Sequence, residues 1–180
     1  NMLAGAGGMD LCMLVVAADE GIMPQTVEHL DILSILGIKN GVIVITKTDL
    51  VEPDFVELVA EDVKELVKGT FLENAPIVPV SVYKEQGLKE LKQILQEQCA
   101  ALPERGDAGH FRLPIDRVFT LKGFGTIVTG TLMEGKLKKD QNIVLYPENV
   151  PVKVRSLQVH SKDAEVAWAG QRVAVNVPDR

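Results

Sequence analysis

The 180-residue sequence has few of the residues that build metal sites and disulfides. It contains two cysteines and three histidines, and neither Cys12 nor Cys99 belongs to a spaced cluster with other cysteines or histidines. Structural zinc sites and disulfide frameworks need such clusters. We therefore expect no metal site, and two reduced cysteines that act as packing residues.

The sequence also lacks an excess of basic residues and a long apolar segment. Its formal net charge is -6, so it is not a generally basic nucleic-acid-binding protein, and any contact with RNA would be local. The apolar run at 11–18 is too short to span a bilayer, and no basic region precedes it as in a signal peptide. These absences favour a cytoplasmic protein without membrane contact.

An apolar run at 42–45 leads directly into polar residues. Four β-branched residues in a row predict a strand that is buried on both faces. Thr46, Lys47 and Asp49 follow at its carboxyl end, where open parallel sheets bind ligands. A carboxylate there can accept two hydrogen bonds from a base with two adjacent N–H donors, and the lysine stem can lie along that base. Guanine has such donors and adenine does not, although a solvated turn would show the same residues.

Strand and helix patterns alternate through residues 1–102. Apolar runs predict strands at 10–18, 42–49 and 76–82, and the last contains a proline that is awkward in a central strand. Apolar residues at helical spacing predict helices over 24–36, 54–72 and 87–99. This alternation predicts an α/β domain with a parallel sheet and crossover helices.

The composition changes after residue 102. Residues 103–112 have no apolar periodicity and are rich in breakers, which predicts a linker. Beyond it, short runs rich in Val, Ile and Thr predict strands at 113–121, 126–133, 141–146, 152–160 and 172–177. These features predict a small all-β barrel over 113–180. Because a barrel removes its edges by closing, and because the sequence starts with Asn1, we expect a piece of a longer protein.

Two sets of motifs resemble the translation GTPases, the family that includes elongation factor Tu. Thr-Lys-Thr-Asp at 46–49 is similar to the family's Asn-Lys-x-Asp guanine motif, with Thr in place of Asn, and Ser81 and Val82 fall where the family has Ser-Ala. Gly-Thr-Ile-Val-Thr-Gly-Thr-Leu at 125–132 looks like the family's second domain. The resemblance implies part of a P-loop GTPase-type sheet at 1–102, followed by translation-factor domain II at 113–180.

Further segments are similar to the selenocysteine-specific branch of this family. They are residues 1–10, 17–30 and 111–120, and the last has Asp-Arg where elongation factor Tu has Glu-Asp. The resemblance implies GTP-dependent delivery of selenocysteinyl-tRNA to the ribosome, with GTP or GDP and magnesium as cofactors and a messenger RNA hairpin as a further partner. It assigns a guanine site to Thr46, Lys47, Asp49, Ser81 and Val82.

The resemblance also assigns a selenocysteine pocket to Asp116, Arg117 and Arg172. A selenol is more acidic than a thiol and is ionised at neutral pH, whereas the serine from which it must be distinguished is neutral. An arginine pair would favour the anion, and Asp116 would orient an arginine or hold the α-amino group. A surface ion pair between neighbouring strands is the alternative interpretation. His160 is expected near this surface.

The catalytic parts of a GTPase are absent from the sequence. There is no Gly-x-x-x-x-Gly-Lys-[Ser/Thr] phosphate loop, no magnesium-holding switch threonine and no catalytic residue of the family. Since phosphate contacts supply most of the charge-assisted binding, we expect this chain alone neither to hydrolyse GTP nor to bind it tightly. The RNA-binding region that reads the messenger hairpin is missing too. The alternatives are another translation GTPase, of the elongation factor Tu or initiation factor 2 gamma type, or a non-catalytic interaction scaffold.

Overall fold

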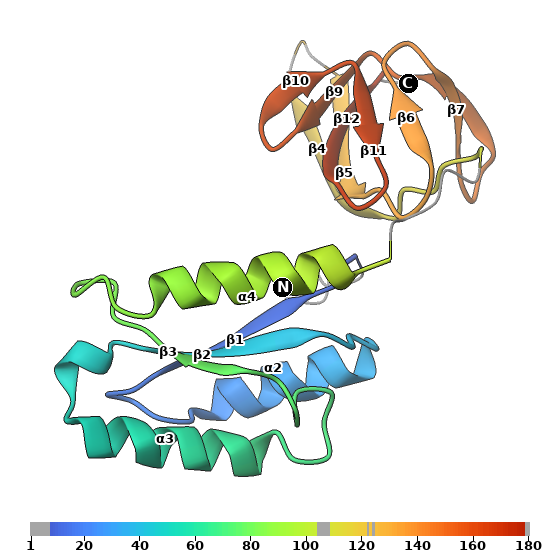
Figure 1. The fold of residues 1–180 in the computed structure, drawn as a ribbon. Helices are drawn as coiled ribbons and strands as arrows, with labels where there is room; N and C mark the ends of the chain where they lie inside the picture. Colours follow the sequence, from blue (N-terminus) through green and yellow to red (C-terminus); the bar gives the residue numbers. More distant parts are fainter. Residues whose placement is uncertain (1–7, 104–108, 122, 124, 179–180) are drawn as a thin grey trace. The chain divides into compact units, whose positions relative to one another are not determined.

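The computed structural model describes residues 8–103, 109–121, 123 and 125–178. The contacts between residues in space divide the chain into two compact units. One is formed by Met9–Pro103, and the other contains Glu104–Arg180. The first unit is α/β and the second is all-β, as the sequence predicts (Figure 1).

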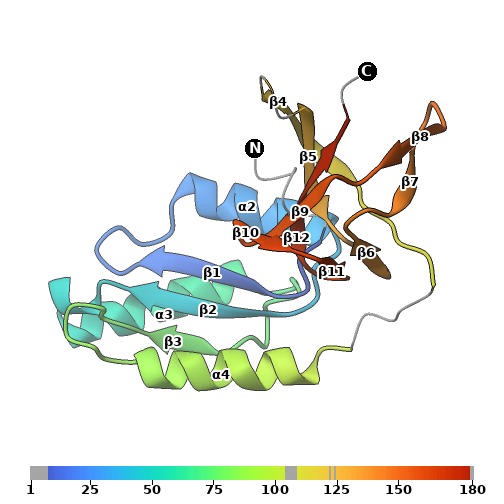
Figure 2. The same cartoon turned by 90° about the horizontal axis from the view of Figure 1, so that it is seen from above.

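The first unit is a parallel sheet with helices on both faces. The strands β1 (Cys12–Ala17), β2 (Gly41–Thr46) and β3 (Ile77–Pro79) pair in the order β1-β2-β3 and lie side by side in Figure 2. Helix α4 (Leu88–Ala101) covers one face, while α2 (Pro24–Ile35) and α3 (Pro53–Leu66) lie on the other (Figure 1). Strand β2 is central, and its residues 42–45 are at most 2% exposed, which confirms the predicted burial on both faces.

Strand β1 differs from the predicted buried run. Its side chains alternate, because Leu14 and Val16 are buried whereas Met13 and Val15 are each 49% exposed. The physical reason is that β1 lies at an edge of the described sheet. Helix α4 packs over β2 and β3, so it leaves one face of β1 uncovered. The apolar residues of this α4 interface are Val42, Val44, Val78, Val80, Leu88, Leu91, Ile94 and Leu95.

Two other elements of this unit are shorter than predicted. Strand β3 ends at Pro79 and is also an edge strand of the described sheet, where a proline costs no ladder hydrogen bond. Helix α3 ends at Leu66 because Gly69 adopts a left-handed φ of 75°, and the turn that follows returns Leu72 to the core with 0% exposure. Cys12 is buried as expected, but Cys99 is exposed on α4, so its predicted packing role is wrong.

The second unit wraps short strands around one apolar core. Its largest sheet has the order β10-β9-β12-β5-β4, and two antiparallel pairs, β11-β6 and β7-β8, complete the described strands. The fully buried core side chains include Leu132, Leu137, Val154 and Leu157. The strands are β4 (Ile115–Leu121), β5 (Gly125–Thr131), β6 (Lys136–Lys138), β7 (Asn142–Leu145), β8 (Val150–Lys153), β9 (Ser156–Val159), β10 (Lys162–Ala164), β11 (Val166–Trp168) and β12 (Arg172–Val177).

The run predicted at 152–160 is two strands. Between β8 and β9 the chain changes partners, because Val154 N–H donates to the Gln141 carbonyl while Arg155 N–H donates to the Asn176 carbonyl. Strand β8 therefore pairs with β7, and β9 pairs with β12. Strands β6, β10 and β11 were not predicted, because each has only three residues and is too short to show an alternating pattern.

Candidate functional site

The ends of β2 and β3 bring Asp49 and Ser81 into direct contact. The Ser81 hydroxyl donates to Asp49 Oδ1 at 2.5 Å and accepts from the Lys84 main-chain N–H at 3.0 Å. Ser81 is fully buried, so its hydroxyl has few alternative partners. The hydrogen bond from Ser81 is the main cause that holds the pKa of the Asp49 carboxyl below its usual value. Asp49 is therefore an ionised carboxylate in a fixed position.

The loop after β3 leaves one main-chain donor available beside this carboxylate. Ser81 and Gln86 exchange two main-chain hydrogen bonds, of 3.1 and 3.0 Å, which close the loop. Gly87 then starts α4 at a φ of 73°, where a Cβ atom would lie 2.1 Å from the Pro79 carbonyl oxygen. Within the described residues the Val82 N–H has no acceptor, and the residue is 72% exposed. The loop thus offers the Val82 N–H to a ligand.

Lys47 also follows β2, but its side chain lies toward β1, whereas Asp49 lies toward β3. It has a left-handed φ of 58°, and its ammonium donates to Asp19 Oδ2 at 3.1 Å and to Glu20 Oε1 at 3.0 Å. The hydrogen bonds with Glu20 and then with Asp19 raise the pKa of Lys47. Thr46 Oγ1 lies 3.5 Å from the Val16 carbonyl oxygen, which is a weak contact with β1.

Asp19 and Glu20 were not predicted from the sequence to be part of the guanine site. They follow the carboxyl end of β1, which pairs with β2 in parallel so that Ala17 lies opposite Thr46. Because parallel strands end at the same edge of a sheet, acidic residues after one strand can reach a lysine after the next. The position of these two acidic residues directly after a predicted strand could therefore have identified them as partners of Lys47.

A bidentate ion pair joins two of the predicted pocket residues in the barrel. Arg172 donates from Nη1 to Asp116 Oδ2 at 2.6 Å and from Nη2 to Asp116 Oδ1 at 2.8 Å. Thr129, on the strand between them, donates its hydroxyl to Asp116 Oδ1 at 2.9 Å. Arg172 is the main cause that lowers the pKa of Asp116, and Asp116 in turn raises the pKa of Arg172.

A bulge in β4 carries Asp116. The pairing with β5 shifts between Ile115, opposite Gly130, and Arg117, opposite Thr129, which leaves Asp116 as the extra residue. Arg117 is exposed and makes no ion pair within the described residues, although its charge contributes to the lowered pKa of Asp116. The structure therefore unites Asp116 with Arg172 and leaves the Arg117 head group to solvent.

A small cavity opens beside this ion pair. It has a volume of about 220 Å³, and His160, which was expected near this surface, lines it together with Arg172. Its lining residues are Thr129, Gln158, His160, Ser161, Arg172, Val173 and Ala174.

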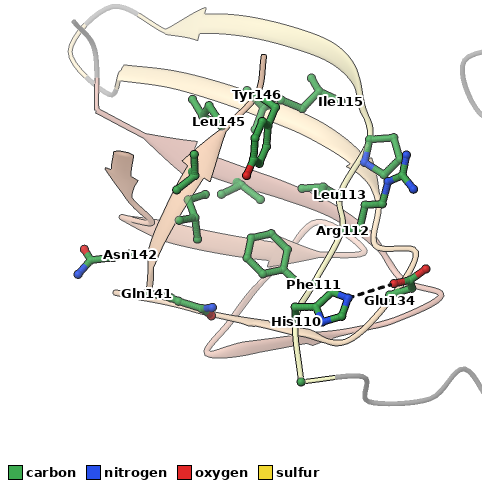
Figure 3. Close-up of a pocket in the computed structure, with 16 residues that line it drawn as sticks. His110, Phe111, Arg112, Leu113, Ile115, Glu134, Gln141, Asn142, Leu145 and Tyr146 are labelled. Atoms are coloured by element: carbon green, nitrogen blue, oxygen red, sulfur yellow. Dashed lines mark ion pairs between the residues drawn. The ribbon is translucent and has the colours of Figure 1, made fainter. Parts of the chain in front are cut away.

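A larger cavity of about 920 Å³ lies elsewhere on the barrel and contains none of the predicted site residues (Figure 3). It is lined mainly by residues 109–115 and by residues 141–146 of β7 and its flanks. The Phe111 and Tyr146 rings point into it, and His110 Nε2 lies 3.9 Å from Glu134 Oε2 at its rim (Figure 3). Its lining combines apolar side chains with those of His110, Arg112 and Glu134.

The described residues contain neither a membrane-spanning helix nor a cluster of metal ligands. None of their helices combines the length and the apolar character needed to cross a membrane. Across the same residues, no group of three or more His, Cys, Asp or Glu side chains is arranged to hold a metal ion.

Comparisons with known proteins agree with the two units. The Elongation factor Tu GTP binding domain family matches residues 1–101, and the Elongation factor Tu domain 2 family matches residues 125–178. A solved structure, translation elongation factor SelB from Methanococcus maripaludis in its apo form, superposes with a TM-score of 0.89 at 33% identity. It matches over 97% of this chain and 38% of that chain.

Selenocysteine-specific elongation factors match nearly the whole sequence. The factor from Desulfomicrobium baculatum is 53% identical over 177 residues, and that from Escherichia coli (strain K12) is 40% identical over 179 residues. Each comparison covers 98% of this chain and 28% of the relative, so the chain spans under a third of their length. Translation initiation factor 2 subunit gamma from Thermococcus onnurineus is 35% identical over 195 residues, covering 97% of this chain and 47% of that relative.

The higher identity with the selenocysteine-specific factors favours that branch over the alternatives that the sequence left open. The chain therefore belongs to the elongation factor Tu family of translation GTPases, and over almost its whole length it is homologous to the selenocysteine-specific elongation factors of that family.

Proposed function

We propose that this chain is the part of a selenocysteine-specific elongation factor that recognises guanine and the aminoacyl end of selenocysteinyl-tRNA. The whole factor, on this proposal, delivers that tRNA to the ribosome in the cytoplasm in a GTP-dependent reaction. A region outside these 180 residues engages the messenger RNA hairpin. GTP or GDP and magnesium are the cofactors of the whole factor, and no residue of this chain is assigned to magnesium.

The geometry around Asp49 fits a guanine base. One lone pair of Asp49 Oδ1 is occupied by the Ser81 hydroxyl, and the carboxylate retains acceptor sites for the N1–H and 2-amino donors of guanine. The Val82 N–H is available for the O6 atom of the base. Bound nucleotide would gain its phosphate contacts from residues that this sequence does not contain.

The Asp116–Arg172 pair is the observation that carries the assignment to selenocysteine. Two hydrogen bonds of 2.6 and 2.8 Å fix the guanidinium plane, so Arg172 presents a directed positive charge to the cavity that it lines. Its side chain is 45% exposed and therefore accessible to a ligand. A fixed cation favours a selenolate over the neutral hydroxyl of serine. Arg117, one residue beyond the bulge, supplies the second charge.

The test compares two amino acids on the same tRNA. The affinity of the full-length protein for selenocysteinyl-tRNA and for seryl-tRNA is measured in the GTP-bound form, with Arg172→Ala and Arg117→Ala as variants. Each variant should weaken binding of selenocysteinyl-tRNA more than binding of seryl-tRNA. Arg112→Ala, which alters the other barrel cavity, is the control and should change neither. Equal losses for the two tRNAs would contradict the pocket assignment.

A further inference from the structure

The Lys47 side chain is restrained in a way that the guanine motif alone does not explain. Thr46 is the last residue of β2, and its carbonyl accepts a 2.8 Å hydrogen bond from the Ala18 N–H, which joins the ends of β1 and β2. Lys47 then leaves the strand with its left-handed φ of 58°. This turn directs its side chain to Asp19 and Glu20, which lie two and three residues beyond the end of β1.

Two carboxylates share one ammonium group at this place. The distances of 3.1 and 3.0 Å use two of the three donors of Lys47, and the side chains of Lys47, Asp19 and Glu20 are 43%, 31% and 56% exposed. A single exposed ion pair contributes little to stability, but two acceptors on one ammonium group define the direction of the lysine side chain. The local charge is one positive against two negative, so Lys47 is a poor receptor for a phosphate. The methylene stem and the third ammonium donor remain available to a ligand.

Lys47 and Asp49 are tied to opposite neighbours of the same strand. Lys47 is bound to residues that follow β1, whereas Asp49 is bound to Ser81, which follows β3. Strand β2 lies between β1 and β3. The two guanine-motif side chains are therefore held apart, one on each side of the central strand end.

We propose that Asp19 and Glu20 are positioning residues for guanine recognition, because their carboxylates hold the Lys47 stem beside the position of the base. This inference rests on the proposed guanine site and adds two residues to it. Asp19 and Glu20 do not touch the base. They act through Lys47, so their removal weakens binding of the base without changing which base is preferred, since Asp49 reads the 2-amino group.

The test uses the 180-residue chain and guanosine, a probe without phosphates that reports on base recognition alone. Binding is followed by the NMR shift of the Val82 amide. The variant Asp19→Asn/Glu20→Gln should bind guanosine roughly threefold to tenfold more weakly, the usual effect of losing one or two hydrogen bonds. The ratio of guanosine to inosine affinity should stay the same, because inosine differs only in lacking the 2-amino group.

Controls separate positioning through Lys47 from a general effect of the change in charge. Glu61→Gln/Asp62→Asn makes the same change of charge on α3 and should leave guanosine affinity unchanged. High salt screens exposed ion pairs. It should therefore lower the guanosine affinity of the unmodified chain toward the affinity of the Asp19→Asn/Glu20→Gln variant. Lys47→Met keeps an apolar stem without the ammonium, so Asp19→Asn/Glu20→Gln should have no further effect in that background.

The outcomes distinguish failure of the positioning role from failure of the guanine site. If Asp19→Asn/Glu20→Gln binds guanosine as the unmodified chain does, or weakens binding equally in the Lys47→Met background, the positioning role is wrong and the guanine site stands. If the unmodified chain binds guanosine no better than adenosine, the guanine site itself is wrong, and the role of Asp19 and Glu20 is lost with it.

Discussion

The Asp116 carboxylate binds both terminal nitrogens of Arg172 although the two residues are 56 positions apart in the sequence. The pair spans strand β5, whose Thr129 hydroxyl donates to the same carboxylate. Asp116 is 11% exposed and Arg172 is 45% exposed, so the carboxylate is largely enclosed and the guanidinium faces solvent. This arrangement suits an acid that orients a cation for an incoming ligand.

Asp116→Asn should destabilise the barrel at neutral pH by about 1 kcal/mol, a value discounted for the exposure of Arg172. Arg172 and Thr129 lower the pKa of Asp116 in the folded state below its ordinary 3.8. The stabilisation is therefore present above pH 3.8 and is lost as the pH falls through the folded-state pKa. Urea unfolding followed by the fluorescence of Trp168, the single tryptophan, measures it.

The difference between the unmodified barrel and Asp116→Asn should accordingly shrink on acidification. Glu148→Gln, a substitution outside the strands, serves as the control and should be neutral at both pH values. A difference that grows as the pH falls below 3.8 would show that the ion pair does not stabilise the fold.

Ser81→Ala should raise the pKa of Asp49 toward its ordinary value, because the hydrogen bond from Ser81 is the main cause of the lowered pKa. The substitution also leaves the Lys84 N–H without its side-chain acceptor. The carboxyl chemical shift of Asp49, followed by NMR as a function of pH, measures the change. Ser34→Ala removes a hydroxyl that donates to the Leu30 carbonyl in α2 and should leave Asp49 unaffected. An unchanged Asp49 titration in Ser81→Ala would contradict the contact.

Asp49→Asn should reduce guanosine affinity roughly tenfold and should favour xanthosine instead. Xanthine has a carbonyl where guanine has its 2-amino group, and an asparagine amide can donate to that oxygen while accepting from N1–H. Titration of the Val82 amide with both nucleosides measures the change of preference. Asp62→Asn on α3 removes an exposed acid away from the site and should leave the preference for guanosine intact. Retention of full guanosine affinity by Asp49→Asn would remove Asp49 from the site.

Gly87→Ala should destabilise the first unit by more than about 2 kcal/mol. The reason is twofold, since Gly87 has a φ of 73° and its Cβ would lie 2.1 Å from the Pro79 carbonyl oxygen. Gly69→Ala is a matched control with a φ of 75° and no atom within 4 Å of the Cβ position. It should cost only the conformational penalty of about 1 kcal/mol. Thermal unfolding followed by circular dichroism compares them, and equal losses would show that the contact with Pro79 is unimportant.

The sequence by itself determined the elements whose burial is uniform and the motifs at their ends. Four β-branched residues at 42–45 predicted the central strand because a strand covered on both faces needs no polar positions. The polar residues after it then identified the carboxyl edge of the sheet. The family resemblance assigned Asp49 and Ser81 to one guanine site, and the structure places their side chains in contact.

The tertiary structure alone decided which charges pair and which strand faces are covered. Lys47 meets Asp19 across 28 positions of sequence. Of the two arginines assigned to the pocket, Asp116 pairs with Arg172, because a bulge in β4 and the strand order bring these two residues to one surface. The exposed face of β1 and the division of residues 152–160 into β8 and β9 likewise follow from where α4, β7 and β12 lie. Periodicity reports how a segment alternates along itself, whereas these features depend on partners that are distant in the sequence, so no local pattern encodes them.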